Sequence, residues 1–72
     1  MGKQKLTKEH AKLIRHLFYN EGRNCYDIQR ETQFSTRSHI FRIVQGIRWG
    51  EINTPTKDEG TLLYWKWVNN EI

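Results

Sequence analysis

Six polar side chains that can hydrogen-bond to the edges of DNA bases lie within the ten-residue stretch 36–45. Arginine can pair with guanine through two hydrogen bonds and glutamine can pair likewise with adenine, whereas hydroxyl groups suit either base. A helix with about 3.6 residues per turn would place Ser38, Arg42 and Gln45 on one face and Ile40 and Ile43 on the other. We therefore expect an amphipathic helix whose outer face can bind base edges. The candidates are Thr36, Arg37, Ser38, His39, Arg42 and Gln45.

A second group of residues could contact the phosphate backbone, which accepts hydrogen bonds from cations, hydroxyls, amides and helix N-termini. Asn24 and Tyr26 stand at the start of a short expected helix, the end that carries partial positive charge. The basic arm of residues 1–6 could enter a minor groove, or it could serve only to keep the chain soluble. The phosphate candidates are Arg23, Asn24, Tyr26, Ser35, Arg48, Lys5 and Lys8.

No set of residues has the spacing of a catalytic or metal-binding motif. The three histidines and Cys25 are scattered along the sequence, so no pair resembles the ligand spacing of a zinc site. The carboxylates show no pairing typical of acid–base catalysis, and no glycine-rich stretch is arranged to cradle a phosphate. We therefore expect a protein that is not an enzyme and that needs neither a metal ion nor a cofactor.

The composition and charge favour a small globular protein that binds a polyanion. The chain has 72 residues, enough for one domain with a thin core, and 36% of them are hydrophobic. Residues 1–50 carry ten Lys and Arg against four Asp and Glu, whereas residues 51–72 carry two against four. No segment is long and apolar enough to span a membrane, and no signal peptide is evident. The single cysteine favours a reducing compartment, the cytoplasm.

The elements that must position these side chains begin with a long helix over residues 7–21. Thr7 is a suitable N-cap, because its hydroxyl can accept a hydrogen bond from a free backbone N–H in the first turn. Apolar residues then recur at helical spacing along one stripe. Gly22 should end the helix, since glycine readily adopts the left-handed conformation found just past helix ends.

Two shorter helices should follow, over about residues 25–32 and 36–46. Asn24 with an acidic residue three positions later predicts the start of the first. Ser35 is the expected cap of the second, and Gly46 marks its end. Ile47 is expected to face inward beside the apolar residues of the second helix. Three short helices with tight links predict an all-α trihelical core, with the last two as a helix-turn-helix pair.

Residues 51–72 form a C-terminal extension whose structure is ambiguous. The aromatic run over residues 61–68 favours a strand, whereas apolar pairs four residues apart favour a helix. We expect a fourth helix, because a lone strand would lack a partner. Thr54 with Pro55 could supply its N-cap and first residue.

The large aromatic residues are expected to serve mainly as core. Phe41 projects sideways from its helix, and we favour packing beneath the C-terminal extension over contact with DNA. Some aromatic residues of the extension could instead form the seam of a homodimer, which would suit binding to two half-sites. The residues expected to be core are Trp49, Tyr64, Trp65 and Trp67.

The stretch NCYDIQRETQFSTRSHIFRIVQGIRWG, residues 24–50, resembles the helix-turn-helix of small phage and bacterial regulators. It is also similar to helix-turn-helix modules attached to phage HNH homing endonucleases, in which a glycine and a tryptophan follow the recognition helix, as Gly46 and Trp49 do here. Those families usually have alanine at position 29 and glycine at position 33, where this chain has Gln29 and Gln33. The turn is also one residue longer, and locally it resembles that of arabinose-regulator-type activators. The resemblance covers residues 6–50.

The resemblance implies a sequence-specific transcription regulator of phage or mobile-element type that inserts residues 36–46 into the major groove of double-stranded DNA. Its location would be the cytoplasm of a bacterium or of a phage-infected host cell. Two alternatives stay open. The domain could bind a host protein such as a polymerase or regulator, or it could target a nuclease or recombinase complex to DNA. The expected organisation is a basic arm over 1–6, a trihelical core over 7–50 and an extension over 51–72.

Overall fold

The computed structural model describes residues 6–72, so the phosphate candidate Lys5 and most of the basic arm lie outside the described residues. Within residues 6–72 every regular element is helical, which confirms the all-α fold class and the fourth helix in the C-terminal extension. The elements are α1 (Lys8–Arg15), a π-helical turn η1 (His16–Asn20), α2 (Cys25–Thr32), α3 (Arg37–Gln45) and α4 (Lys57–Val68).

The first expected helix is present, but its second half is wound more loosely than an α-helix. Thr7 caps α1 by accepting a hydrogen bond from the His10 backbone N–H, and the Thr7 N–H is in turn bonded to the His10 ring. From His16 the chain forms a π-helical turn, in which the His16 carbonyl accepts from the backbone N–H of Glu21 at 3.2 Å. Gly22 follows with φ of 74°, as expected of the residue that ends the element.

Short polar side chains set where α2 and α3 begin. Asn24 caps α2 as expected, its side-chain oxygen accepting from the Asp27 backbone N–H at 2.8 Å. The prediction that Ser35 caps α3 is wrong. The cap is Thr36, whose hydroxyl accepts from the His39 backbone N–H at 3.3 Å, while the Ser35 hydroxyl is bonded to the His39 ring at 2.7 Å.

Left-handed residues end both of these helices. Gln33 follows α2 with φ of 55°, a left-handed conformation that glycine adopts more readily than other residues. Gly46 follows α3 with φ of 85° and confirms the expected end of that helix. The turn between α2 and α3 is therefore residues 33–36.

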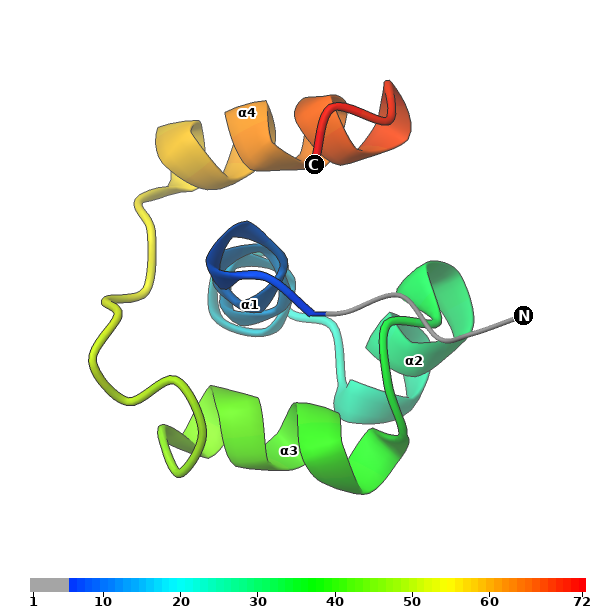
Figure 1. Ribbon diagram of the computed structural model, residues 1–72, viewed down its shortest axis with the longest axis vertical. Helices are drawn as coiled ribbons and strands as arrows, with labels where there is room; N and C mark the ends of the chain where they lie inside the picture. Colours follow the sequence, from blue (N-terminus) through cyan, green and yellow to red (C-terminus); the bar gives the residue numbers. More distant parts are fainter. Residues whose placement is uncertain (1–5) are drawn as a thin grey trace.

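α1 is the central element, and the other helices pack around it. In Figure 1, α4 lies on one side of α1 and α3 on the opposite side, with α2 beside them. The core combines residues of all three N-terminal helices, of η1 and of the segment after α3. Its fully or nearly fully buried members are Ala11, Leu13, Ile14, Leu17, Ile28, Ile40, Ile43, Val44 and Ile52.

α4 packs on α1 and η1 through its inner face. It begins after Thr56, which caps it, and not at Thr54–Pro55. Gly60 is buried against His16, where a Cβ would lie 2.0 Å from the ring Nδ1, so only glycine fits this approach without movement. Trp67 packs edge-on against Phe34 of the α2–α3 turn, with ring centroids 5.6 Å apart.

Three core expectations are wrong. Ile47 is 66% exposed, because α3 ends at Gln45 and the chain turns away before it. Phe41 is 48% exposed and does not pack beneath the C-terminal extension, because α4 covers the other side of α1. Trp65 is 56% exposed, because it lies on the outer face of α4, whereas Trp49, Tyr64 and Trp67 pack against the core as expected.

Candidate nucleic-acid interface

The outer face of α3 is open to solvent. Arg37, Ser38, Arg42 and Gln45 are exposed, while Ile40, Ile43 and Val44 are buried on the opposite face, as the helical spacing predicts. Phe41 joins the open face, four residues from both Arg37 and Gln45. We call Arg37, Ser38, Phe41, Arg42 and Gln45 the α3 face. Residues 36–50 contain three arginines and no acidic residue, so the α3 face and its flanks are positively charged.

The two other base-contact candidates are already engaged within the protein. The Thr36 side chain is exposed, but its hydroxyl accepts the capping hydrogen bond of α3. His39 is half-buried, and its ring is bonded to the Ser35 hydroxyl. Both residues therefore stabilise the start of α3, together with Ser35, a candidate for phosphate contact.

The end of α3 is held by a buried arginine that sequence reasoning treated only as one of the positive charges. Arg15 of α1 is 4% exposed and its guanidinium donates hydrogen bonds to four backbone carbonyls. Its Nε donates to the Ile43 carbonyl at 2.8 Å and its Nη1 to the Ile52 carbonyl at 2.6 Å. Its Nη2 donates to the carbonyls of Arg48 at 3.2 Å and Trp49 at 2.9 Å.

This arrangement satisfies carbonyls that a helix end otherwise leaves free and places a cation at the negative end of the helix dipole. Tyr19 assists, because its hydroxyl donates to the Val44 carbonyl at 2.6 Å. Trp49 has φ of 59°, a left-handed conformation that is strained for a bulky residue. The hydrogen bond from Arg15 helps to hold it there. One sequence signal did mark Arg15: it lies four residues after Ala11, on the buried stripe of α1.

α2 packs against α3. Burial raises the pKa of Cys25 in the first turn of α2, and the positive charge of Arg37 in the first turn of α3 opposes this rise. Asn24 and Tyr26 flank Cys25 and are both exposed. These two phosphate candidates therefore lie, exposed, at the start of the helix that packs against α3. The guanidinium of Arg30 lies over the exposed Tyr26 ring, with its Cζ atom 5.7 Å from the ring centroid.

The remaining phosphate candidates differ in their surroundings. Lys8 at the start of α1 and Arg48 after α3 are both exposed. Arg23 instead forms an ion pair with Glu31 of α2, and Glu31 also accepts a hydrogen bond from the Tyr64 hydroxyl of α4 at 3.1 Å. Glu31 thus links Arg23 to Tyr64 of α4.

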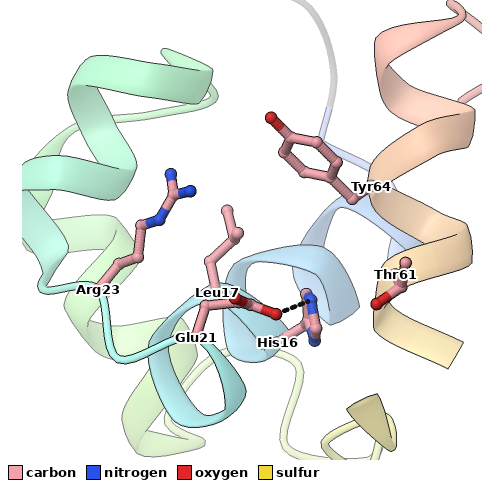
Figure 2. A pocket seen from close by; sticks show the side chains of 6 residues that line it. All are labelled: His16, Leu17, Glu21, Arg23, Thr61 and Tyr64. Atoms are coloured by element: carbon pink, nitrogen blue, oxygen red, sulfur yellow. Dashed lines mark ion pairs between the residues drawn. The ribbon is translucent and has the colours of Figure 1, made fainter. Parts of the chain in front are cut away.

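A pocket of about 180 Å³ lies between η1, the segment that follows it and α4 (Figure 2), and no residue of the α3 face lines it. The buried ring of His16 has its Nε2 3.3 Å from a carboxylate oxygen of Glu21 and its Nδ1 2.9 Å from the Asn20 amide nitrogen. Desolvation by burial lowers the His16 pKa, although the Glu21 carboxylate opposes this. The Thr61 hydroxyl donates to the Lys57 carbonyl at 2.8 Å. The polar side chains of the pocket named here are thus already bonded to neighbouring groups of their own segment.

Within residues 6–72 no three His, Cys, Asp or Glu side chains gather as a metal site would require. In that same range no helix has both the length and the apolar character needed to cross a bilayer. Comparison of the chain with protein-family models, with curated proteins and with solved structures gave no match.

Proposed function

We propose that this protein is a sequence-specific DNA-binding regulator that inserts α3 into the major groove of double-stranded DNA. The observation that carries the proposal is the α3 face, a solvent-open helical surface with two arginines and a glutamine, over a buried apolar face. Arg37 and Arg42 suit guanine and Gln45 suits adenine. A helix that reads bases must be both accessible and rigidly held, and Arg15 and Thr36 fix the two ends of this one.

Phosphate contacts would set the orientation of α3 in the groove. Asn24, Tyr26 and the backbone N–H groups of the first turn of α2 stand at the start of the helix that packs against α3, where they can meet one strand. Arg48 and Lys8 supply further exposed cations. The class of regulator, phage or mobile-element, rests on the resemblance of residues 6–50 alone.

The proposal is tested by selecting preferred sites from random duplexes with the purified protein and measuring affinity by fluorescence anisotropy. We expect one preferred site, and a roughly 5- to 150-fold weaker Kd for Arg42→Ala, the value of one good arginine–guanine pair. Lys57→Ala is the matched control, because Lys57 is an exposed cation on α4, across α1 from α3. Failure to select any site, or equal losses in the two variants, would refute the proposal.

A second candidate function, self-association, is favoured by an apolar stripe on the outer face of α4. Leu62, Trp65 and Val68 recur every three residues and are 63%, 56% and 45% exposed. Asp58 lies toward one end of the stripe and Lys66 toward the other. The partner would be a second copy, because two α4 helices packed antiparallel would bring each Asp58 near the Lys66 of the other copy and oppose the helix dipoles favourably.

Sedimentation velocity at increasing protein concentration tests this second candidate. We expect a concentration-dependent dimer that Trp65→Glu abolishes, because each copy would then bury a carboxylate in the apolar seam. Ile47→Glu is the control, since Ile47 is equally exposed but lies beyond the end of α3. A monomer at every concentration would exclude the homodimer.

A further inference from the structure

Phe41 is the one large apolar side chain of the α3 face, and 48% of it is exposed. Within residues 6–72 it is not among the apolar side chains that pack against the core. Its neighbours along the same helical row are Arg37 and Gln45, four residues to either side. A phenyl ring is therefore held between two side chains that suit base edges.

Spacing along the helix places Phe41 midway between Arg37 and Gln45. Four residues of α-helix rise about 6 Å, so the ring lies about 6 Å along the axis from the positions of Arg37 and Gln45. Neighbouring base pairs are separated by about 3.4 Å. With α3 in the major groove, the ring would meet bases between those that the two polar residues contact.

Among the common bases, thymine alone offers a methyl group in the major groove. It presents its C5 methyl there, whereas guanine, cytosine and adenine are distinguished at the corresponding edges by their hydrogen-bond donors and acceptors. Contact with the methyl would remove apolar surface of the ring from water, and contact with a polar edge would desolvate that edge without a hydrogen bond.

We propose that Phe41 is a specificity-determining residue that selects thymine at a central position of the DNA site through contact with its C5 methyl group. This inference rests on the proposed function, because it assumes that α3 lies in the major groove. It narrows the ligand to duplexes with thymine between the bases contacted by Arg37 and Gln45.

The test replaces each thymine of the selected site, one at a time, with uracil. Uracil keeps every hydrogen-bonding group of thymine and lacks only the methyl, so any change in Kd reports that methyl. We expect one position at which uracil weakens binding about fourfold, the value of one buried methyl or methylene. Phe41→Ala should remove the thymine preference there, giving equal Kd for the two duplexes. Phe41→Leu should keep part of it, because leucine is still apolar.

Ile47→Ala is the matched control, since Ile47 is an exposed apolar residue of the same region, and it should keep the fourfold preference. A selected site without thymine, or one that binds equally well with uracil throughout, would overturn the inference and leave the proposed function standing. A methyl preference that persists in Phe41→Ala would assign the contact to another residue and overturn it as well. If the unaltered protein selects no DNA, both proposals fail together.

Discussion

The Nε of Arg15 donates a hydrogen bond to the Ile43 carbonyl at 2.8 Å and thereby joins the last turn of α1 to the last turn of α3. The same guanidinium donates to carbonyls of the segment after α3, at Arg48, Trp49 and Ile52. One buried side chain therefore fixes both the end of the helix and the path of the chain that leaves it. Since these bonds bridge about thirty residues of sequence, they contribute to stability only in the folded state.

Arg15→Met should lower the free energy of unfolding by about 2–4 kcal/mol, because it strands buried carbonyls that the guanidinium satisfied. Urea denaturation followed by circular dichroism measures the change. Arg15→Lys should cost less, since an ammonium keeps the charge but cannot reach all four carbonyls. Lys12→Met is the control on the same helix, where the side chain is only half-buried. An Arg15→Met midpoint equal to that of the control would contradict this account.

Gly60→Ala should destabilise the protein although alanine is the better helix former. Inside an exposed helix the substitution would stabilise by roughly 1 kcal/mol. Here the new Cβ would lie 2.0 Å from the His16 Nδ1, so α4 or the ring must move, at a cost of about 1–3 kcal/mol.

The double variant Gly60→Ala with His16→Ala identifies the cause of that loss. Removal of the ring relieves the clash, so Gly60→Ala should no longer destabilise in the His16→Ala background. The coupling is read from thermal unfolding of the four proteins of the cycle. Additive losses would mean that the glycine is required for a reason other than close approach to His16.

Stability should fall as the pH drops below the ordinary histidine pKa of 6.5, because of His16. Burial, with smaller contributions from Lys57 and Arg23, outweighs the Glu21 carboxylate and lowers the His16 pKa in the folded state. Below 6.5 the unfolded chain therefore binds a proton that the folded protein does not, and the free energy of unfolding decreases until the folded-state pKa is passed. Above 6.5 this contribution to the pH dependence vanishes.

Melting temperatures between about pH 8 and pH 5 measure how steeply the stability falls with pH. NMR titration of the imidazole protons assigns it to His16, whose midpoint should lie below 6.5. His16→Gln should show a shallower slope than the unaltered protein, whatever its absolute stability. A His16 midpoint above 6.5 would show that Glu21 dominates over burial.

The salt dependence of DNA binding should report which cations meet phosphate. A plot of log Kd against log salt concentration changes in slope by about one for each phosphate contact that is removed. Arg48→Ala should reduce the slope in this way and weaken all duplexes alike. Arg23→Ala should leave it unchanged, because Glu31 already neutralises Arg23. If Arg23→Ala reduced the slope and Arg48→Ala left it unchanged, the DNA backbone would lie on the α2–α4 side of the molecule.

Local signals in the sequence were sufficient for most helix boundaries. Asn24 and Gly46 stand where the structure places a cap and a helix end, because short polar side chains and glycine satisfy helix termini through neighbouring backbone groups. The choice between Ser35 and Thr36 as the cap of α3 failed, because both are good caps. Contact with His39 decides which hydroxyl is free to accept from the backbone.

Features that depend on tertiary contacts were beyond the sequence pattern. Helical spacing predicted the inward and outward faces of α3, since both follow from the helix alone. It could not show that α4 packs on the far side of α1, and so it misplaced Phe41 and Trp65. Arg15 was counted only as one of the positive charges. Its place on the buried stripe of α1 could have marked it as buried, but the four carbonyls that it contacts lie far along the sequence.

The positions of α3 and α4 on opposite sides of α1 make the two candidate surfaces sterically independent. A duplex seated against Arg42 would leave Trp65 uncovered, and anything seated against Trp65 would leave Arg42 uncovered. A pair of copies joined back to back through Trp65 would point its two reading helices in opposite directions. Such a pair would tether two separate stretches of DNA, in contrast to regulators whose paired helices enter successive grooves of a single duplex.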